Sequence, residues 1–198
     1  MSRPVLKERT GRATRRAADA QRWADKKVMR HLAICIPFAL AVEATPTLAG
    51  TDELADVRVV YEEVRAALER GSLTRRERRF EYCEPYQDAS RQLYASSSGA
   101  VRLYVRDAGS DDSAVTWHHY YDDSGCLRFV LITGGAVNGT QIEHRVWFAT
   151  DGRKLREERK LLKGPGYTFP DTWPVEDLVK DPQQAFASPN PCKEISGK

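Results

Sequence analysis

Hydrophobic residues recur with two different periods along this chain, and each period predicts a different element. Over residues 51–70 they recur at three- and four-residue spacing, which places them on one face of a helix: Leu54, Val57, Tyr61, Val64 and Leu68. Thr51 can cap this helix, and Gly71 follows its last turn. Because a helix with one apolar stripe has to bury that stripe, we expect it to pack on a sheet.

From residue 75 the period changes to two, which is typical of strands. The predicted strands are 75–83, 91–96, 100–106, 114–121, 126–133, 140–149 and 153–161. Short Gly-, Asp- and Asn-containing turns separate most of them, and such turns make neighbouring strands antiparallel, because a parallel pair needs a long crossover. The sequence therefore predicts an α+β fold: an antiparallel β-meander of about six or seven strands, with one N-terminal helix packed on one face.

The C-terminal residues 164–198 have a third pattern, irregular and rich in proline. A short helix is predicted from Pro174 to Lys180, with proline in its first turn. The segment is too apolar for a free tail, since it contains Phe169, Trp173, Leu178, Val179 and Phe186. We expect it to wrap the helix-and-sheet domain of residues 50–163.

Residues 1–49 have the layout of a secretory signal. Residues 1–30 hold ten Lys and Arg, the apolar run Leu32–Val42 follows, and small residues precede Gly50. Val42-Glu43-Ala44 and Thr47-Leu48-Ala49 both fit a cleavage site, and cleavage after Ala49 is favoured. Met29 offers a second start that would leave about 28 residues upstream of the true one. The alternatives are a buried core helix, which Pro37 opposes, and a lipoprotein signal, in which Ile34 is too large before Cys35. The predicted location is therefore periplasmic or secreted.

Charge and cysteine content follow from this division. Residues 50–198 carry 21 Lys and Arg against 24 Asp and Glu, so binding to nucleic acid is not expected, and the membrane is involved only through the export signal. Without Cys35, three cysteines remain, which in an oxidising compartment implies one bridge and one leftover thiol. We predict Cys83–Cys192, which would fasten the C-terminal tail, although three pairings are open. No spacing suggests zinc, and no metal or cofactor is expected.

One pattern occurs twice. Residues 120–127 (YYDDSGCL) and 147–155 (WFATDGRKL) each have an aromatic strand end, an Asp/Gly turn and a leucine that restarts the next strand. Over roughly residues 100–161 the chain resembles uncharacterised exported bacterial proteins with a leading helix and successive hairpins of this type. The resemblance implies a similar fold and carries no activity or functional residue.

Histidine is the usual carrier of acid–base or metal chemistry. Alternation places His119 with Trp117 on the apolar face of the sheet, and His144 lies in an equivalent apolar pattern. With a free Cys126 nearby, the two histidines suggest a hydrolase or a metal-dependent enzyme. The competing interpretation, which we favour because no carboxylate stands at ligand spacing, is that both are hydrogen-bonded histidines at the edge of a core.

The opposite face of the sheet carries the strongest binding hypothesis. Alternation predicts a lattice of arginines and aromatic rings there: Arg102, Tyr104, Arg106, His118, Tyr120, Arg128, Arg145 and Trp147. Such a surface suits sugar rings or anionic groups, because guanidinium groups match carboxylate and phosphate and rings offer a flat apolar face. The alternative is a solvated face with cross-strand Arg–aromatic pairs and no ligand.

Together these features predict an exported binding or interaction module rather than an enzyme. Its expected partner is a cell-envelope glycan, an anionic polymer or a protein. The two other hypotheses are the His119 and His144 enzyme and a purely structural or inhibitory partner protein.

Overall fold

A computed structural model of the 198-residue chain describes residues 49–81, 88–166, 169, 173, 174 and 177–189. The predicted signal sequence with Cys35, and the predicted Cys83–Cys192 bridge, lie outside these residues. Within them, no helix is long and apolar enough to span a membrane.

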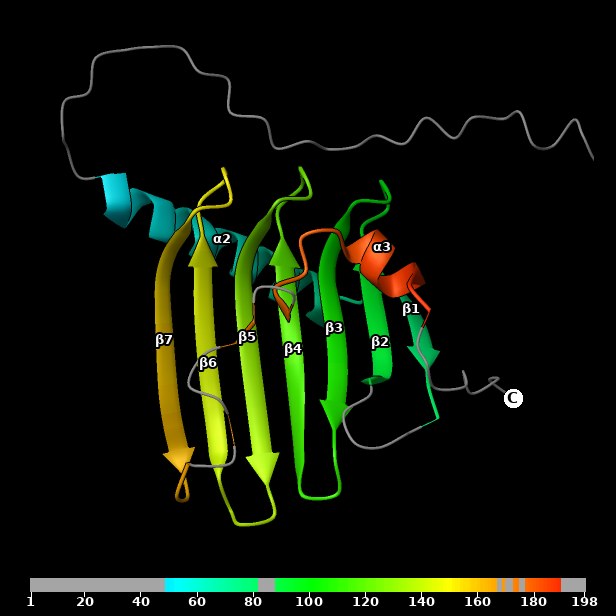
Figure 1. Ribbon diagram of the computed structural model, residues 1–198. Coiled ribbons are helices and arrows are strands. Elements are labelled where there is room, and N and C mark those ends of the chain that lie inside the picture. Colours follow the sequence, from blue (N-terminus) through cyan, green and yellow to red (C-terminus); the bar gives the residue numbers. More distant parts are fainter. Residues whose placement is uncertain (1–48, 82–87, 167–168, 170–172, 175–176, 190–198) are drawn as a thin grey trace, which may run out of the picture. The chain divides into compact units, whose positions relative to one another are not determined.

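The protein is a single antiparallel sheet of seven strands in sequential order, with the helix α2 on one face and the small helix α3 near the other (Figure 1). This architecture confirms the predicted α+β meander. The elements are α2 (Ala49–Glu69), β1 (Thr74–Arg79), β2 (Asp88–Ala95), β3 (Val101–Gly109), β4 (Ser113–Tyr121), β5 (Leu127–Ala136), β6 (Gln141–Phe148), β7 (Lys154–Lys163) and α3 (Pro182–Ala187).

The turns explain why the strands follow one another so regularly. In the two repeated segments, the N–H of Gly125 donates to the carbonyl of Asp122, and that of Gly152 donates to the carbonyl of Ala149, both at 3.0 Å. Both glycines have φ near +84°, a conformation that glycine adopts without steric cost. The repeated sequence is therefore a repeated hairpin turn.

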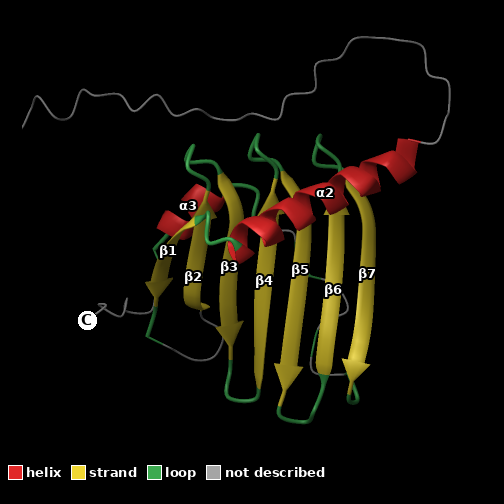
Figure 2. Cartoon of the chain, turned by 180° about the vertical axis from the view of Figure 1, so that it is seen from behind, coloured by secondary structure: helices red, strands yellow, loops and turns green. Residues whose placement is uncertain are grey.

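Helix α2 crosses one face of the sheet obliquely (Figure 2). Its buried residues Val57 and Val64 pack on strands β3–β5, and the ring of Tyr61 meets the edges of Tyr120 and Phe129 at centroid distances of 5.1 and 5.4 Å. We call this side of the sheet the α2 face.

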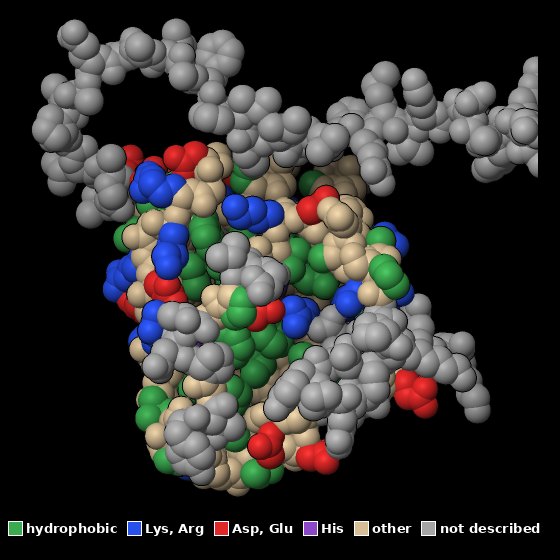
Figure 3. Space-filling model, in the orientation of Figure 1, with side chains coloured by type: hydrophobic (Ala, Val, Ile, Leu, Met, Phe, Trp, Pro, Cys, Tyr) green, Lys and Arg blue, Asp and Glu red, His purple; other side chains and the backbone are tan. Residues whose placement is uncertain are grey.

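Described residues of the C-terminal segment lie against part of the second face. Leu178, Val179 and Phe186 belong to or pack against the core cluster of this face. Figure 1 shows α3 in front of this face near β1–β3, and Figure 3 shows hydrophobic side chains in the middle of the same view. Of the short helix predicted at 174–180, the described residues show 3₁₀ conformation at Asp177, whose N–H donates to the carbonyl of Pro174 at 3.1 Å, and no helix at 178–180. The C-terminal helix is α3, and Asp181 caps it by accepting from the N–H of Gln184 at 2.9 Å.

The two edge strands are protected by charge. In β7, seven of ten residues are Lys, Arg or Glu, and β1 has the sequence TRRERR. Charged side chains on an edge strand oppose pairing with the edge of another molecule. The sheet therefore ends in two strands that are unfavourable for further strand addition.

Candidate functional site

The side chains of the α2 face are arranged in rows that cross the sheet, with one residue from each strand. The aromatic row is Arg75, Tyr94, Leu103, Tyr120, Phe129, Trp147 and Arg156. The middle row is Glu77, Gln92, Val105, His118, Leu131, Arg145 and Glu158. The polar row is Arg79, Ser90, Asp107, Thr116, Thr133, Glu143 and Lys160. Over three rows the face thus changes from largely aromatic to wholly polar.

A groove of about 460 Å³ lies between α2 and strands β2–β4. Tyr61, Arg65 and Leu68 of α2 form one wall, and members of all three rows form the floor. The guanidinium of Arg65 lies 5.9 Å from the centroid of the Tyr61 ring, and its side chain is 55% exposed. A groove with an apolar base and a few converging polar groups is the usual form of a small-molecule site.

The polar row is fixed by hydrogen bonds along the groove floor. The carboxylate of Asp107 accepts from the hydroxyl of Ser90 at 2.6 Å and from that of Thr116 at 2.7 Å. In the aromatic row, the hydroxyl of Tyr94 donates to the side-chain oxygen of Gln92 at 2.8 Å. These bonds hold the side chains in place before any ligand arrives.

His118 stands between these two sets of side chains. Burial lowers its pKa, and the nearby carboxylate of Asp107 opposes that shift without cancelling it. The imidazole is therefore neutral at pH 7. Its Nδ1 is buried and has no hydrogen-bond partner among the described residues. Because this nitrogen is enclosed by protein atoms, a ligand in the groove would contact the His118 ring rather than this atom.

Tyr120, at the base of the groove, is a neutral group. Burial raises the pKa of Tyr120 well above its ordinary value, with a further contribution from Tyr61, while Arg65 lowers it. The phenol therefore keeps its proton throughout the physiological range, and no acid–base role follows for it.

Two other predicted residues, Arg145 and Trp147, lie on the same face, farther along the rows. Arg145 makes an ion pair with Glu143 at 3.0 Å, whereas its Nε is buried without a partner among the described residues. Trp147 packs in the aromatic row 5.4 Å from Phe129, and the guanidinium of Arg156 lies 5.5 Å from its ring centroid.

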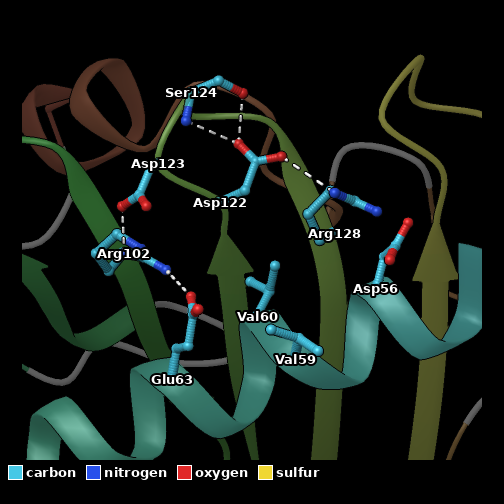
Figure 4. Close-up of a pocket in the computed structure, with 9 residues that line it drawn as sticks. All are labelled: Asp56, Val59, Val60, Glu63, Arg102, Asp122, Asp123, Ser124 and Arg128. Carbon is cyan, nitrogen blue, oxygen red and sulfur yellow. Dashed lines mark hydrogen bonds and ion pairs between the residues drawn. The ribbon is translucent and has the colours of Figure 1, made fainter.

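Arg102 and Arg128 lie in a second depression, of about 380 Å³, on the other side of α2 (Figure 4). Each is the extra residue of a β-bulge, which takes it out of the alternation. Arg102 pairs with Asp123, donates to the carbonyl of Tyr121 at 3.1 Å and donates to Glu63 at 3.2 Å.

Arg128 is satisfied in the same way. It donates to the carbonyl of Phe148 at 3.2 Å and pairs with Asp122 at 3.3 Å. Asp122 in turn accepts from the N–H groups of Ser124 and Cys126, both at 3.0 Å. Both guanidinium groups are thus engaged by the protein itself. We therefore interpret this depression as a structural contact between the turns and α2 rather than as a ligand site.

Tyr104 and Arg106 lie on the opposite face. Tyr104 is buried beside His119, and Arg106 pairs with Asp177 at 3.0 Å and lies 4.6 Å from the Trp117 ring centroid. The predicted lattice of eight residues is therefore wrong as a single surface. His118, Tyr120, Arg145 and Trp147 share the α2 face, and the other four have the separate roles described above.

The two histidines of the enzyme hypothesis are contacts of the C-terminal segment. The Nε2–H of His119 donates to the carbonyl of Asp177, and Nδ1 of His144 accepts from the indole N–H of Trp173, both at 2.7 Å. Burial lowers the pKa of His119 to about 4. No group of three potential metal ligands occurs within the described part of the chain.

Cys126 is not the free thiol that this hypothesis used, because it is disulfide-bonded. Cys126 is the only cysteine that the structure describes, so its partner lies outside the described residues.

Sequence reasoning missed Arg65 of α2 and the polar residues Ser90, Asp107 and Thr116. One signal for the last two was present, since each lies two residues from a middle-row position on its strand: Asp107 from Val105, and Thr116 from His118. Period-two alternation therefore already placed them on one face.

Comparison with protein families, curated proteins and solved structures gives no match for this chain.

Proposed function

We propose that this protein is an exported, non-enzymatic binding module that holds a glycan of low net charge in the groove between α2 and strands β2–β4. The observation that carries the proposal is the groove itself. It combines tyrosine rings with a line of hydroxyl, amide and carboxylate groups that hydrogen bonds hold in place.

The chemistry of the walls suits a sugar. A sugar ring has a flat apolar face and a rim of hydroxyl groups that both donate and accept hydrogen bonds. Tyr61 and Tyr94 supply an aromatic surface with a polar end, while Asp107, Thr116 and Gln92 supply acceptors and donors. Arg65, at the exposed rim, adds further donors.

The charges favour a neutral glycan over an anionic polymer. The middle and polar rows hold three basic residues (Arg79, Arg145 and Lys160) and four acidic ones (Glu77, Asp107, Glu143 and Glu158). With Arg65 the two signs are equal. A surface with balanced charge gives no general attraction to a polyanion.

The alternative enzyme hypothesis has less support. His119 and His144 are buried, and each bonds to the C-terminal segment, so neither faces the groove. The third hypothesis, a partner protein that acts only by contact, becomes an outcome of the test below.

The test is binding of the purified residues 50–198 to a panel of immobilised polysaccharides. The panel would hold neutral chains (chitin, cellulose and starch) and anionic ones (heparin and alginate). We expect a neutral member to bind and the anionic members not to. Replacing Arg65→Ala or Gln92→Ala should weaken binding about tenfold each, the effect of losing roughly one hydrogen bond.

Arg58→Ala is the matched control, because Arg58 is an exposed arginine of the same helix outside the groove. It should leave binding unchanged. Absence of binding to every neutral glycan, or equal effects of Arg58→Ala and Arg65→Ala, would overturn the proposal. Capture of a protein through the same residues would favour the contact hypothesis instead.

A further inference from the structure

We infer that the glycan held in this groove carries a free amine, which binds as an ammonium group to the carboxylate of Asp107. The inference rests on the proposed function and adds to it a chemical group of the ligand.

The first reason is the position of the carboxylate. Asp107 lines the polar end of the groove, and Leu103, on the same strand, lines its aromatic end. The two residues are four positions apart, or about 13 Å along a strand. A linked chain of sugars can therefore place one ring beside the aromatic row while another unit reaches Asp107.

The second reason is that no cation of the protein neutralises this carboxylate. Within the part of the chain that the structure describes, no Lys or Arg forms an ion pair with Asp107. The neighbouring imidazole of His118 is no counterion either, because burial lowers its pKa and keeps it neutral at pH 7. Arg65, at the rim of the groove, pairs with Glu69 at 3.2 Å. The groove therefore ends at a carboxylate whose charge a cationic group of a ligand would balance.

The third reason is the direction of the hydrogen bonds. The hydroxyls of Ser90 and Thr116 both donate to Asp107, at 2.6 and 2.7 Å, so each presents acceptor lone pairs to a ligand rather than its proton. An ammonium group has three donors and no acceptor, and its hydrogen bond to a carboxylate is about twice as strong as a neutral one. An N-acetyl group would instead bring a carbonyl oxygen, a further acceptor, to these acceptors.

A metal ion suits this position less well than an amine. Calcium takes about six to eight oxygen ligands. No group of three potential metal ligands occurs among the described residues, so Asp107 would have to hold the ion with hydroxyl groups alone.

The experiment is calorimetric titration of residues 50–198 at pH 7, where a sugar amine is largely protonated. The probes are the glucosamine tetramer, the N-acetylglucosamine tetramer and cellotetraose, which share one backbone and differ in an amine, an acetamide or a hydroxyl group. We expect the glucosamine tetramer to bind at least about tenfold more tightly than the other two. Asp107→Asn should remove that difference, because it removes the charge and nearly conserves the volume of the side chain.

Glu62→Gln is the matched control, because Glu62 is an exposed carboxylate of α2 outside the groove. It removes the same charge from the protein and should leave the preference for the amine intact. Circular dichroism of each variant would verify the fold. If Asp107→Asn disturbs the fold, the three probes on the natural chain still decide the inference.

The outcomes separate the two proposals. If the natural chain binds the glucosamine tetramer no more tightly than the other two, or if the two variants weaken its binding equally, the amine site is overturned and the groove proposal stands. Tetralysine that binds as tightly, and loses its affinity in Asp107→Asn, also overturns the inference, in favour of a basic peptide. Failure of all three tetramers and of every neutral polysaccharide to bind overturns both proposals.

Discussion

The indole N–H of Trp173 donates to Nδ1 of His144 at 2.7 Å, and this bond fastens the C-terminal segment to the middle of β6. The same indole ring meets Trp117 edge-on at a centroid distance of 5.4 Å. Arg91 continues the attachment on the same face, nearer the β1 edge of the sheet, by donating to the carbonyls of Ala185 and Ser188. Side chains of the sheet thus hold the C-terminal segment largely through hydrogen bonds to its main-chain carbonyls.

Replacing Trp173→Phe should destabilise the fold by about 1–3 kcal/mol, because it leaves the buried Nδ1 of His144 without its donor while keeping an aromatic ring against Trp117. The measurement is the free energy of unfolding in urea. Val137→Ala, at a residue that is 81% exposed, is the control and should change the free energy by less than about 0.5 kcal/mol. Equal stability of the two variants would mean that the bond contributes nothing.

His119 makes the stability depend on pH. Burial lowers its pKa from 6.5 to about 4; the carbonyls of Asp177 and Tyr104 oppose that shift, while Arg106 and His118 add to it. Below pH 6.5 His119 is protonated in the unfolded chain, whereas in the folded chain it stays neutral until about pH 4. The contribution of His119 to the free energy of unfolding should therefore be constant above pH 6.5 and fall by about 3 kcal/mol towards pH 4.

The measurement is urea unfolding at pH 7.5, 6, 5 and 4 for the natural chain and for His119→Gln. The variant keeps a donor for the carbonyl of Asp177 but does not titrate. Carboxylates titrate in both proteins, so the difference between the two curves isolates the histidine. Parallel curves would show that His119 is not held neutral in the folded state.

Arg102 should matter more for stability than its exposed counterpart Arg153. Both bond α2 to a turn, Arg102 through Glu63 and Arg153 through Glu53, but the side chain of Arg102 is 12% exposed and that of Arg153 is 57% exposed. Arg102 also satisfies the carbonyl of Tyr121. We expect Arg102→Ala to lower the free energy of unfolding by about 1–3 kcal/mol and Arg153→Ala by less than about 1 kcal/mol. If urea titration showed Arg153→Ala to be the less stable variant, the structural role of Arg102 would be contradicted.

The elements were predictable because their signals are local. The helix stripe, the alternation of the strands and the glycine turns each depend on a few neighbouring residues, and the meander follows from the short turns. The choice of face was not local. Tyr120 and Phe129 on one side and Trp117 and Ile132 on the other are equally apolar, so alternation could not say which side α2 covers.

Two further features could not be predicted from the sequence, for related reasons. The bulges at Arg102 and Arg128 break the period of two, and nothing in the sequence around either residue marks the extra position. The groove depends on Arg65 meeting His118 and Asp107 across α2 and two strands, which is tertiary packing. Period-two alternation could have predicted the polar row. Recognising it as part of a site required knowing where α2 ends.

The disulfide of Cys126 gives a test of the predicted processing. If cleavage follows Ala49, the mature chain lacks Cys35, and an intramolecular bond of Cys126 can only go to Cys83 or Cys192. Peptide mapping, without reduction, of the protein recovered from its host should then find one of these two linkages and a first residue of Gly50. A Cys83–Cys192 linkage in the same molecule would require Cys126 to pair with Cys35, and so would exclude cleavage after Ala49.

The charged edge of β7 should keep the protein monomeric. Replacing Arg156, Arg159 and Lys160 together by threonine removes three charges from the edge strand and raises its strand propensity. We expect the variant to form dimers or larger species by edge pairing, measured by size exclusion with light scattering at several concentrations. The same triple replacement at Arg58 and Glu62 of α2 and at Arg70 in the turn after it, all three exposed, should leave the protein monomeric. A monomeric β7 variant would mean that the bulges at Leu155 and Leu162, rather than the charges, protect this edge.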